Sequence, residues 1–222
     1  MSANCPISLL RLLQLVSPTL PVGAFSSSQG LEWAVEQGWA HDEASAHLWI
    51  SGLLRHSTAT LEAPLIAAVM AAHDHIDEVR RFNAEFLASR ESAELRAECL
   101  RMGYSLARLA SELPELANID GIATPEFAYP TVWALIAAAW DIEIATAVPA
   151  YLFSCCENQV TAAVKLIPLG QSAGQRILSD LARQIPALVA NTAPESAWNA
   201  LAPGQAIASC RHESQYCRLF RS

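Results

Sequence analysis

A chain of 222 residues is long enough to bury one hydrophobic core, so a single domain is expected. Hydrophobic residues make up 52% of the chain and charged residues only 16%, and we expect part of this apolar surface to lie in interfaces, as in a homodimer. The net charge of −8 argues against binding to the phosphate backbone of nucleic acids.

The chain contains no segment that is typical of a membrane span or an export signal. The apolar segments 127–140 and 144–156 are both shorter than the roughly 20 residues that a bilayer requires, so they predict buried core helices. The apolar stretch 9–16 is interrupted by Arg11 and Gln14 and has no basic flank or small-residue cleavage site. We therefore expect a cytoplasmic protein without a membrane anchor.

The six cysteines are predicted to be free thiols. They contain no C-x-x-C pair, and a chain with this apolar content does not need a disulfide framework to fold. The adjacent Cys155 and Cys156 lie in an apolar helical run, where cysteine usually packs as a small hydrophobic residue.

Apolar side chains recur with the 3.6-residue period of a helix through almost the whole chain, so we predict an all-α bundle of packed helices. In chain order, the first well-defined pair runs from about 43 to 57 and from 62 to 72, with Asp42 as the N-cap of the first helix. Pro64 fits the first turn of the second helix, so the two helices are expected to be divided near it.

The clearest helix follows Ser92, where apolar residues spaced by three and four positions form a single stripe. The members of this stripe are Leu95, Cys99, Met102, Leu106, Leu109 and Leu113. A later helix begins after Gly170, and because Pro186 cannot donate a backbone hydrogen bond, a kink or stop is expected near Ile185. Clusters of proline and glycine predict loops at 17–23, 114–125, 168–170 and 194–204.

The last residues are predicted to form a tail, 205–222, on an all-helical body, 1–204. The Pro203-Gly204 pair marks a break before the tail. Three arginines and one glutamate give the tail side chains a charge of 3 − 1 = +2, opposite in sign to the charge of the whole chain. The tail is therefore expected to differ from the body in its contacts.

The tail is also rich in arginine and aromatic residues, the types that dominate binding hot spots. Tyr216, Leu219 and Phe220 are spaced as i, i+3 and i+4, which predicts one helical face able to dock into a groove. We expect the tail to be mobile in the isolated protein and ordered by a partner.

The sequence gives little support for an enzyme. It has no phosphate-binding G-x-x-x-x-G-K loop and no G-x-G-x-x-G turn, and we expect no G-x-S-x-G nucleophile elbow. Cys210 and His212 could form a thiolate–imidazole pair, but no third group that would orient them is evident. We predict no catalytic residues.

The nearest approach to a metal motif is His73-Asp74-His75. Positions i and i+2 of a helix do not face each other, whereas two metal ligands from one helix are usually i and i+4. A polar helix end followed by a solvated loop is therefore favoured over a metal site, and His73 and His75 are assigned no metal role.

Three other segments are harder to explain as structure alone. In the first, 17–32, two prolines and a glycine stiffen a turn before three serines that could cap a helix, and a connector and a functional loop are about equally expected. The second, 163–171, contains Lys165, the only lysine of the chain; a lysine at a helix end is often structural. The third segment is the tail.

Together these three segments resemble the UreF family of urease accessory proteins. The first matches the family pattern at Leu20, Pro21, Gly23, Phe25, Ser28, Gly30, Leu31 and Glu32. The second resembles its V-K-L-[hydrophobic]-P-x-G-Q turn, and the third resembles its terminal R-H-E-x-Q-Y-x-R-L-F-x-S. The motifs have the family's order and spacing, and the resemblance spans nearly the whole chain.

The resemblance implies a helical homodimer that forms a complex with UreD (also called UreH) and the GTPase UreG and acts on urease apoprotein. It implies no cofactor bound by this chain itself, because the nickel is handled by the complex, and no catalytic residue. The early loop and the tail are implied to recruit the GTPase, and the tail to become ordered with UreD. The implied partner-binding residues are Phe25, Ser28, Gly30, Glu32, Lys165, Arg211, His212, Glu213, Tyr216, Arg218 and Phe220.

Phe25 and Arg218 are the leading candidates among these residues. Some relatives have tyrosine at the position of Phe25, so the ring must act here by packing alone. A scaffold is our first hypothesis. The alternative is a regulator of UreG, in which Arg211, Arg218 or Arg221 approaches the transferred phosphate as an arginine finger.

Overall fold

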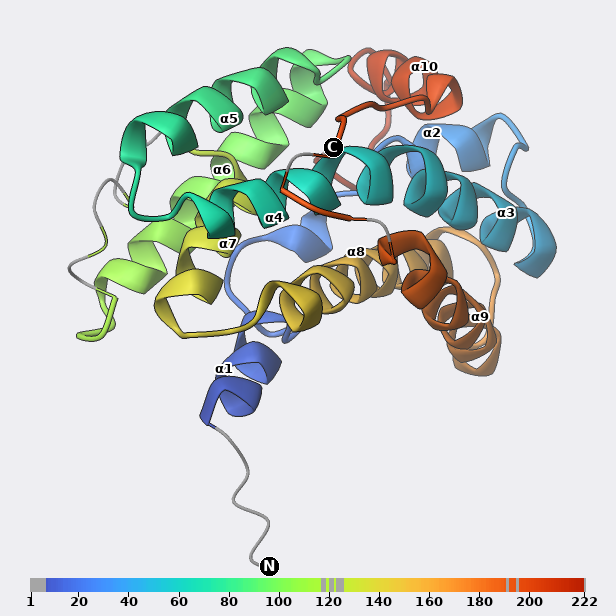
Figure 1. Ribbon diagram of the computed structural model, residues 1–222. Coiled ribbons are helices and arrows are strands. Elements are labelled where there is room, and N and C mark those ends of the chain that lie inside the picture. Colours follow the sequence, from blue (N-terminus) through green and yellow to red (C-terminus); the bar gives the residue numbers. More distant parts are fainter. Residues whose placement is uncertain are drawn as a thin grey trace, which may run out of the picture.

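The computed structural model describes residues 7–116, 119, 122, 126–190, 192–194 and 196–221. In this part of the chain the protein consists of helices joined by turns and loops, without a strand, and the predicted all-α fold is confirmed (Figure 1). In chain order the elements are α1 (Ile7–Leu15), the 3₁₀ turn η1 (Ala24–Ser26), α2 (Leu31–Glu36), α3 (Glu43–Leu53), the π-helix η2 (Leu54–Glu62), α4 (Ala63–Ala71), α5 (Ile76–Ala88), α6 (Ala93–Ser111), α7 (Tyr129–Ala139), α8 (Ile144–Leu166), α9 (Gln171–Val189) and α10 (Pro203–His212).

Helices α4 and α7 form the centre of the core. Helix α4 is buried from Ala63 to Met70 and packs against α5, α7 and α8. Helix α7 is buried from Pro130 to Ala137, and both helices are apolar on every side, as expected where no face meets water. The segments predicted as core helices, 127–140 and 144–156, correspond to α7 and to the first half of α8. No helix in the described ranges is long and apolar enough to cross a membrane.

The predicted division of the chain near Pro64 is wrong. Helix α3, η2 and α4 follow one another without a non-helical residue, because η2 continues the helix as a π-helix. Pro64 does lie in the first turn of α4, and Asp42 is the N-cap of α3, where its Oδ1 accepts the Ser45 N–H at 2.8 Å. The periodicity of apolar residues does not distinguish an α-helix from the wider π-helix.

The π-helix also binds the linker that precedes α10. The carbonyl groups of His56 and Thr60 accept hydrogen bonds from the backbone N–H groups of Leu201, at 2.7 Å, and Asn199, at 3.0 Å. In a regular α-helix the backbone carbonyls accept hydrogen bonds from N–H groups of the same helix. In η2 the carbonyls of His56 and Thr60 also accept hydrogen bonds from the linker. The linker is thereby fixed to the body shortly before α10 begins.

A kink or a stop was predicted near Ile185, and the helix does not stop there. Helix α9 runs through Pro186 to Val189, and its buried face, with Ile177 and Leu181, packs on α8. This packing outweighs the backbone hydrogen bond that proline cannot make.

The predicted apolar stripe of α6 does face the core. Of the predicted loops, 114–125 lies largely outside the described residues.

The tail is not separated from the body by a break at Pro203-Gly204. Pro203 begins α10, a position that proline favours, so the expected boundary between 204 and 205 falls inside a helix. The predicted helical face of the tail is wrong: α10 ends at His212, Tyr216 is exposed, and Phe220 is buried in the core. The aromatic residues of the tail thus divide between solvent and core.

We predict that Gly103→Ala destabilises the protein. A Cβ at Gly103 of α6 would lie 2.2 Å from the carbonyl oxygen of Phe127, which precedes α7. We expect the free energy of unfolding in urea to fall by about 1–3 kcal/mol because the backbone must move. Gly52→Ala in α3 is the control, because its Cβ would meet no atom within 4 Å. Equal stability of the Gly103→Ala protein and the wild type would contradict this close approach.

Candidate functional site

Three segments that lie far apart in the sequence meet at one place in the fold. These are the early loop at 20–32, the end of α8 at Lys165, and the tail. Helix α10 packs beside α2 and against α6 (Figure 1). The tail then runs back to the early loop, where the Arg221 N–H donates to the Ser26 carbonyl at 2.9 Å.

A buried histidine between two carboxylates forms the centre of this site. The imidazole Nδ1 of His212 lies 2.9 Å from Oε2 of Glu94, and its Nε2 lies 3.1 Å from Oε2 of Glu32. The His212 side chain is 0% exposed, and both carboxylates are almost completely buried. We call these three residues the Glu–His–Glu cluster. Because ionised carboxylates only accept hydrogen bonds, a ring nitrogen that carries a proton can donate to the carboxylate that it faces.

Glu32 of α2 also binds the backbone of the tail. Its Oε1 accepts the Leu219 N–H at 2.5 Å, and its Oε2 accepts the Phe220 N–H at 2.9 Å. The Phe220 ring enters the core, and the Lys165 ammonium lies 5.8 Å from the centre of that ring, a cation–π contact. The only lysine of the chain therefore supports the end of the tail.

The tail also caps the N-terminus of α6. Ser92 is the N-cap of this helix, and its hydroxyl lies 2.6 Å from the hydroxyl of Ser209 in α10. The Glu213 side chain accepts the Glu94 N–H at 3.1 Å, and Arg218 Nη1 lies 3.4 Å from Glu94 Oε1. Carboxylates at this position interact favourably with the positive end of the helix dipole.

Gly30 allows the early loop to touch α10. Its φ of +87° is a conformation that other residues rarely adopt, and a Cβ there would lie 2.9 Å from the Ser209 nitrogen. Beside it, Ser28 is completely buried and its hydroxyl accepts the Glu32 N–H at 3.4 Å. The early-loop motif is thus a packing surface for the tail.

Comparison with known proteins agrees with these motifs. The UreF family model matches residues 40–182, and the chain is 55% identical over 225 residues to the urease accessory protein UreF of Dechloromonas aromatica (strain RCB), covering 97% of this chain and 98% of that protein. The chain belongs to the UreF family. The UreF proteins of Azoarcus sp. (strain BH72) and Methylobacillus flagellatus are 54% and 45% identical, over 97% of this chain and 96% and 98% of theirs.

The residues singled out from the UreF motifs separate into two sets in the structure. The buried set connects the loop, the body and the tail, and consists of Ser28, Gly30, Glu32, His212 and Phe220. The exposed set faces solvent, and consists of Phe25, Lys165, Arg211, Glu213, Tyr216 and Arg218. A partner could contact only the exposed set directly in this conformation.

Sequence reasoning missed Glu94 and Ser92, the residues of α6 in this site. Glu94 lies next to the apolar stripe of α6 and reads as one of several surface acids on that helix. Glu94 is buried because His212 of α10, which is 118 residues later in the chain, packs against it. No local pattern in the sequence signals a contact of that separation.

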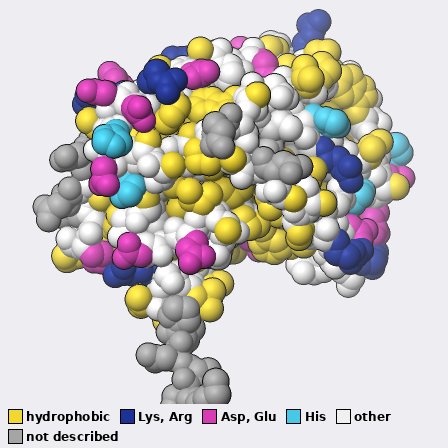
Figure 2. Space-filling model, viewed as in Figure 1, with side chains coloured by type: hydrophobic (Ala, Val, Ile, Leu, Met, Phe, Trp, Pro, Cys, Tyr) yellow, Lys and Arg dark blue, Asp and Glu magenta, His cyan; other side chains and the backbone are white. Residues whose placement is uncertain are grey.

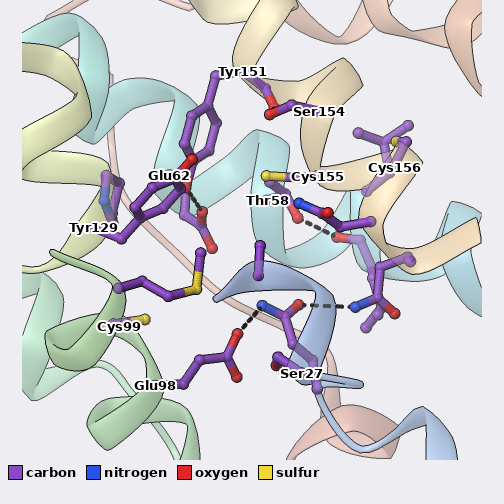
Figure 3. Close-up of a pocket in the computed structure, with 18 of the residues that line it drawn as sticks. Ser27, Thr58, Glu62, Glu98, Cys99, Tyr129, Tyr151, Ser154, Cys155 and Cys156 are labelled. Atoms are coloured by element: carbon purple, nitrogen blue, oxygen red, sulfur yellow. Dashed lines mark hydrogen bonds between the residues drawn. The ribbon is translucent and has the colours of Figure 1, made fainter. Parts of the chain in front are cut away.

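A second buried polar group lies in a pocket behind the early loop (Figure 3). The Tyr151 hydroxyl donates to Glu62 at 2.5 Å, and burial raises the pKa of the Glu62 carboxyl although the Arg90 guanidinium 3.6 Å away opposes the shift. Across the pocket, Glu98 accepts a hydrogen bond from Gln29 Nε2 at 3.0 Å. The early loop therefore closes a polar interior as well as supporting the tail.

The arrangement offers little for covalent chemistry. Burial raises the pKa of the Cys99 thiol to about 12, and it also raises the pKa of Cys155 and Cys156. The thiolate is the nucleophilic form, so these thiols are poor nucleophiles. The ring nitrogens of His212 both face carboxylates, which argues against its pairing with Cys210 as a general base.

The expectation that the sequence contains no G-x-S-x-G match was wrong, because residues 170–174 read G-Q-S-A-G. This segment joins α8 to α9, whereas a nucleophile elbow follows a strand. The other candidate, His73-Asp74-His75, lies in the turn between α4 and α5, where His73 Nδ1 is 2.9 Å from the Met70 carbonyl. Among the described residues, no group of three or more potential ligands could hold a metal ion.

We predict that thiol labelling separates the cysteines into two classes. At about pH 8 only about one Cys99 side chain in ten thousand is a thiolate, whereas Cys210 and Cys217 are exposed. Iodoacetamide followed by peptide mass spectrometry should therefore modify Cys210 and Cys217 first and Cys99 only after denaturation. Rapid labelling of Cys99 in the native protein would contradict its burial.

Proposed function

We propose that this chain is a non-enzymatic scaffold in urease maturation. It joins UreD (UreH) and the GTPase UreG to urease apoprotein in the cytoplasm, acts as a homodimer, and leaves nickel to be handled by the complex. The proposal rests on membership of the UreF family, whose curated members are named urease accessory proteins. It involves neither nucleic acid nor a membrane.

One structural observation supports a scaffold in particular. The early loop, the tail and the end of α8 are held together by contacts between them, and each segment also exposes side chains to solvent. Phe25 is 65% exposed, and Tyr216 and Leu219 are at least as accessible. Arginine and aromatic residues at a preformed site are typical of binding hot spots.

The neighbouring surface is apolar as well. Hydrophobic side chains gather over α10 and α2 (Figure 2). A shallow groove between these helices has a mixed lining, which consists of Trp33, Ile207 and Tyr216 with the polar residues Glu36, Gln37, Arg211, Ser214 and Gln215. Aromatic residues and arginine are enriched in protein–protein interfaces, and this groove offers Trp33, Tyr216 and Arg211.

The alternative function is regulation of GTP hydrolysis by UreG. The exposed arginines of the tail, Arg211, Arg218 and Arg221, favour it, because an arginine that reaches the transferred phosphate accelerates hydrolysis strongly. Arg218 is already paired with Glu94, so Arg211 and Arg221 are the better candidates for a finger.

The scaffold proposal predicts that Phe25→Ala weakens assembly without weakening the fold. Co-purification with tagged UreD and UreG should fall at least about tenfold, because truncating an aromatic hot spot often costs 2 kcal/mol or more. Tyr104→Ala on α6 is the control, since Tyr104 is an exposed aromatic residue that belongs to none of the three motifs. Unchanged assembly of the Phe25→Ala protein would contradict this surface, and so would equal losses in both variants.

GTP turnover by UreG separates the two functions. A scaffold should leave the turnover of UreG nearly unchanged when this protein is added, and Arg211→Ala and Arg221→Ala should behave like the wild type. A rise of several powers of ten that is lost in one of these variants would establish the regulator instead.

A further inference from the structure

We propose that Gln29, Glu98 and Gln159 are positioning residues, which hold the early loop in the shape that presents Phe25 to a partner. Gln29 lies in the early loop, Glu98 in α6 and Gln159 in α8. The inference rests on the proposed function, because it takes Phe25 as a residue that contacts a partner. It assigns a role to polar side chains that lie below the loop rather than on its surface.

The early loop ends in a tight turn that is unfavourable for glutamine. The Leu31 N–H donates to the Ser28 carbonyl at 3.0 Å, which closes a four-residue turn from Ser28 to Leu31. Its two central residues, Gln29 and Gly30, have φ angles of +51° and +87°. Two left-handed residues are typical of a type I′ turn, in which glycine, asparagine and aspartate predominate. Gly30 suits this turn, whereas the backbone of Gln29 adopts a conformation that a residue with a long side chain disfavours.

The side-chain amide of Gln29 is bound through both its donor and its acceptor. Its Nε2 donates to Oε1 of Glu98 at 3.0 Å, and its Oε1 accepts a hydrogen bond from Nε2 of Gln159 at 3.4 Å (Figure 3). The same nitrogen of Gln159 lies 3.4 Å from the carbonyl oxygen of Ser28. A strained backbone persists only where the surrounding structure holds it, and here α6 and α8 provide the contacts that do so.

Both partners of this amide are buried. Glu98 is 4% exposed and Gln159 is 6% exposed. In the described part of the chain, Gln29 is the one hydrogen-bond partner of the Glu98 side chain, whose Oε2 has none. A buried acceptor that loses its donor costs free energy, and a hydrogen bond is stronger where water is excluded. The polar groups below the loop therefore favour its closed shape.

Phe25 is connected to this turn by a short, well-bonded segment. In η1 the N–H groups of Ser26 and Ser27 donate to the carbonyls three residues earlier, at 3.0 Å and 3.1 Å. Ser27 and Ser28, which lie between η1 and Gln29, are buried. A loop released at Gln29 would therefore no longer fix the direction of the Phe25 ring.

The hydrogen bonds of the Gln29 side chain lie within the body of the protein. Their partners belong to α6 and α8 and not to the tail. The positioning therefore does not require the tail and can be measured on the isolated full-length protein.

Gln29→Leu tests the positioning role, because leucine keeps most of the side-chain bulk and removes the amide. Hydrogen exchange is measured at the loop amides of Ser26, Ser27 and Leu31, with amides of α4 as an internal reference. We expect the opening constant of the loop amides to rise about tenfold while α4 stays protected. The control is Gln175→Leu, the same change at an exposed glutamine of α9, which should leave the exchange of the loop unchanged.

Two variants of Glu98 distinguish positioning from general packing. Glu98→Gln keeps an acceptor for the Gln29 amide, so the exchange of the loop should stay close to that of the wild type. Glu98→Leu removes the acceptor and should raise the exchange as Gln29→Leu does. Adding Gln29→Leu to Glu98→Leu should raise it little further, because both changes remove the same hydrogen bond.

Assembly connects the loop to the proposed function. Co-purification with tagged UreD and UreG should fall at least about threefold for Gln29→Leu and Glu98→Leu, because fewer molecules hold the loop in the competent shape. It should stay near the wild-type level for Glu98→Gln and Gln175→Leu. Adding Gln29→Leu to Phe25→Ala should cause little further loss, since a positioning residue acts through the residue that it positions.

Three outcomes would overturn the positioning role: wild-type exchange of the loop in Gln29→Leu, equal exchange in the two Glu98 variants, or full assembly of a variant whose loop has opened. A wild-type protein that does not co-purify with UreD and UreG would instead overturn the proposed function, and the exchange of the loop would still decide whether Gln29 holds it. If Gln29→Leu does not fold, the comparison of Glu98→Gln with Glu98→Leu decides.

Discussion

The Glu32 carboxylate constrains the whole functional end of this molecule. It accepts hydrogen bonds from His212, Leu219 and Phe220, which lie 180 or more residues away in the chain. These hydrogen bonds can form only after α2, α6 and α10 have packed together. They therefore depend on the tertiary structure and not on local structure. The α4–α7 core places these helices, and the carboxylate then fixes where the chain ends.

The C-terminal tail is attached to the body by a buried polar cluster, the Glu–His–Glu cluster, rather than by apolar packing alone. Replacing buried ion pairs with apolar side chains is often neutral or stabilising, so stability alone does not explain the cluster. Charged groups with directional hydrogen bonds specify one docked geometry and penalise alternatives. Here that geometry leaves Phe25 and Tyr216 in solvent while Phe220 is buried, a division that apolar packing by itself would not favour.

The sequence predicted whatever depends on local pattern. Helical periodicity predicted the all-α fold, residue type predicted the cap at Asp42, and two short apolar runs predicted core helices. The motifs identified the segments that meet at the site. Two predicted interruptions were not found. A π-helix joins α3 to α4, so the chain does not divide near Pro64, and packing on α8 carries α9 past Pro186. Glu94 was not predicted, because its burial depends on a contact with His212, 118 residues later, and a local sequence pattern cannot show such a contact.

The hydrogen bond between Arg221 and Ser26 has a practical consequence for anyone who produces this protein. A fusion joined to the chain after this contact would begin close to Ser26, the residue that follows Phe25, so its linker would compete with a partner for the early loop. Helix α1 lies on the other side of the fold from α10 (Figure 1). A tag joined to the chain ahead of α1 would begin on the side of the fold away from α10.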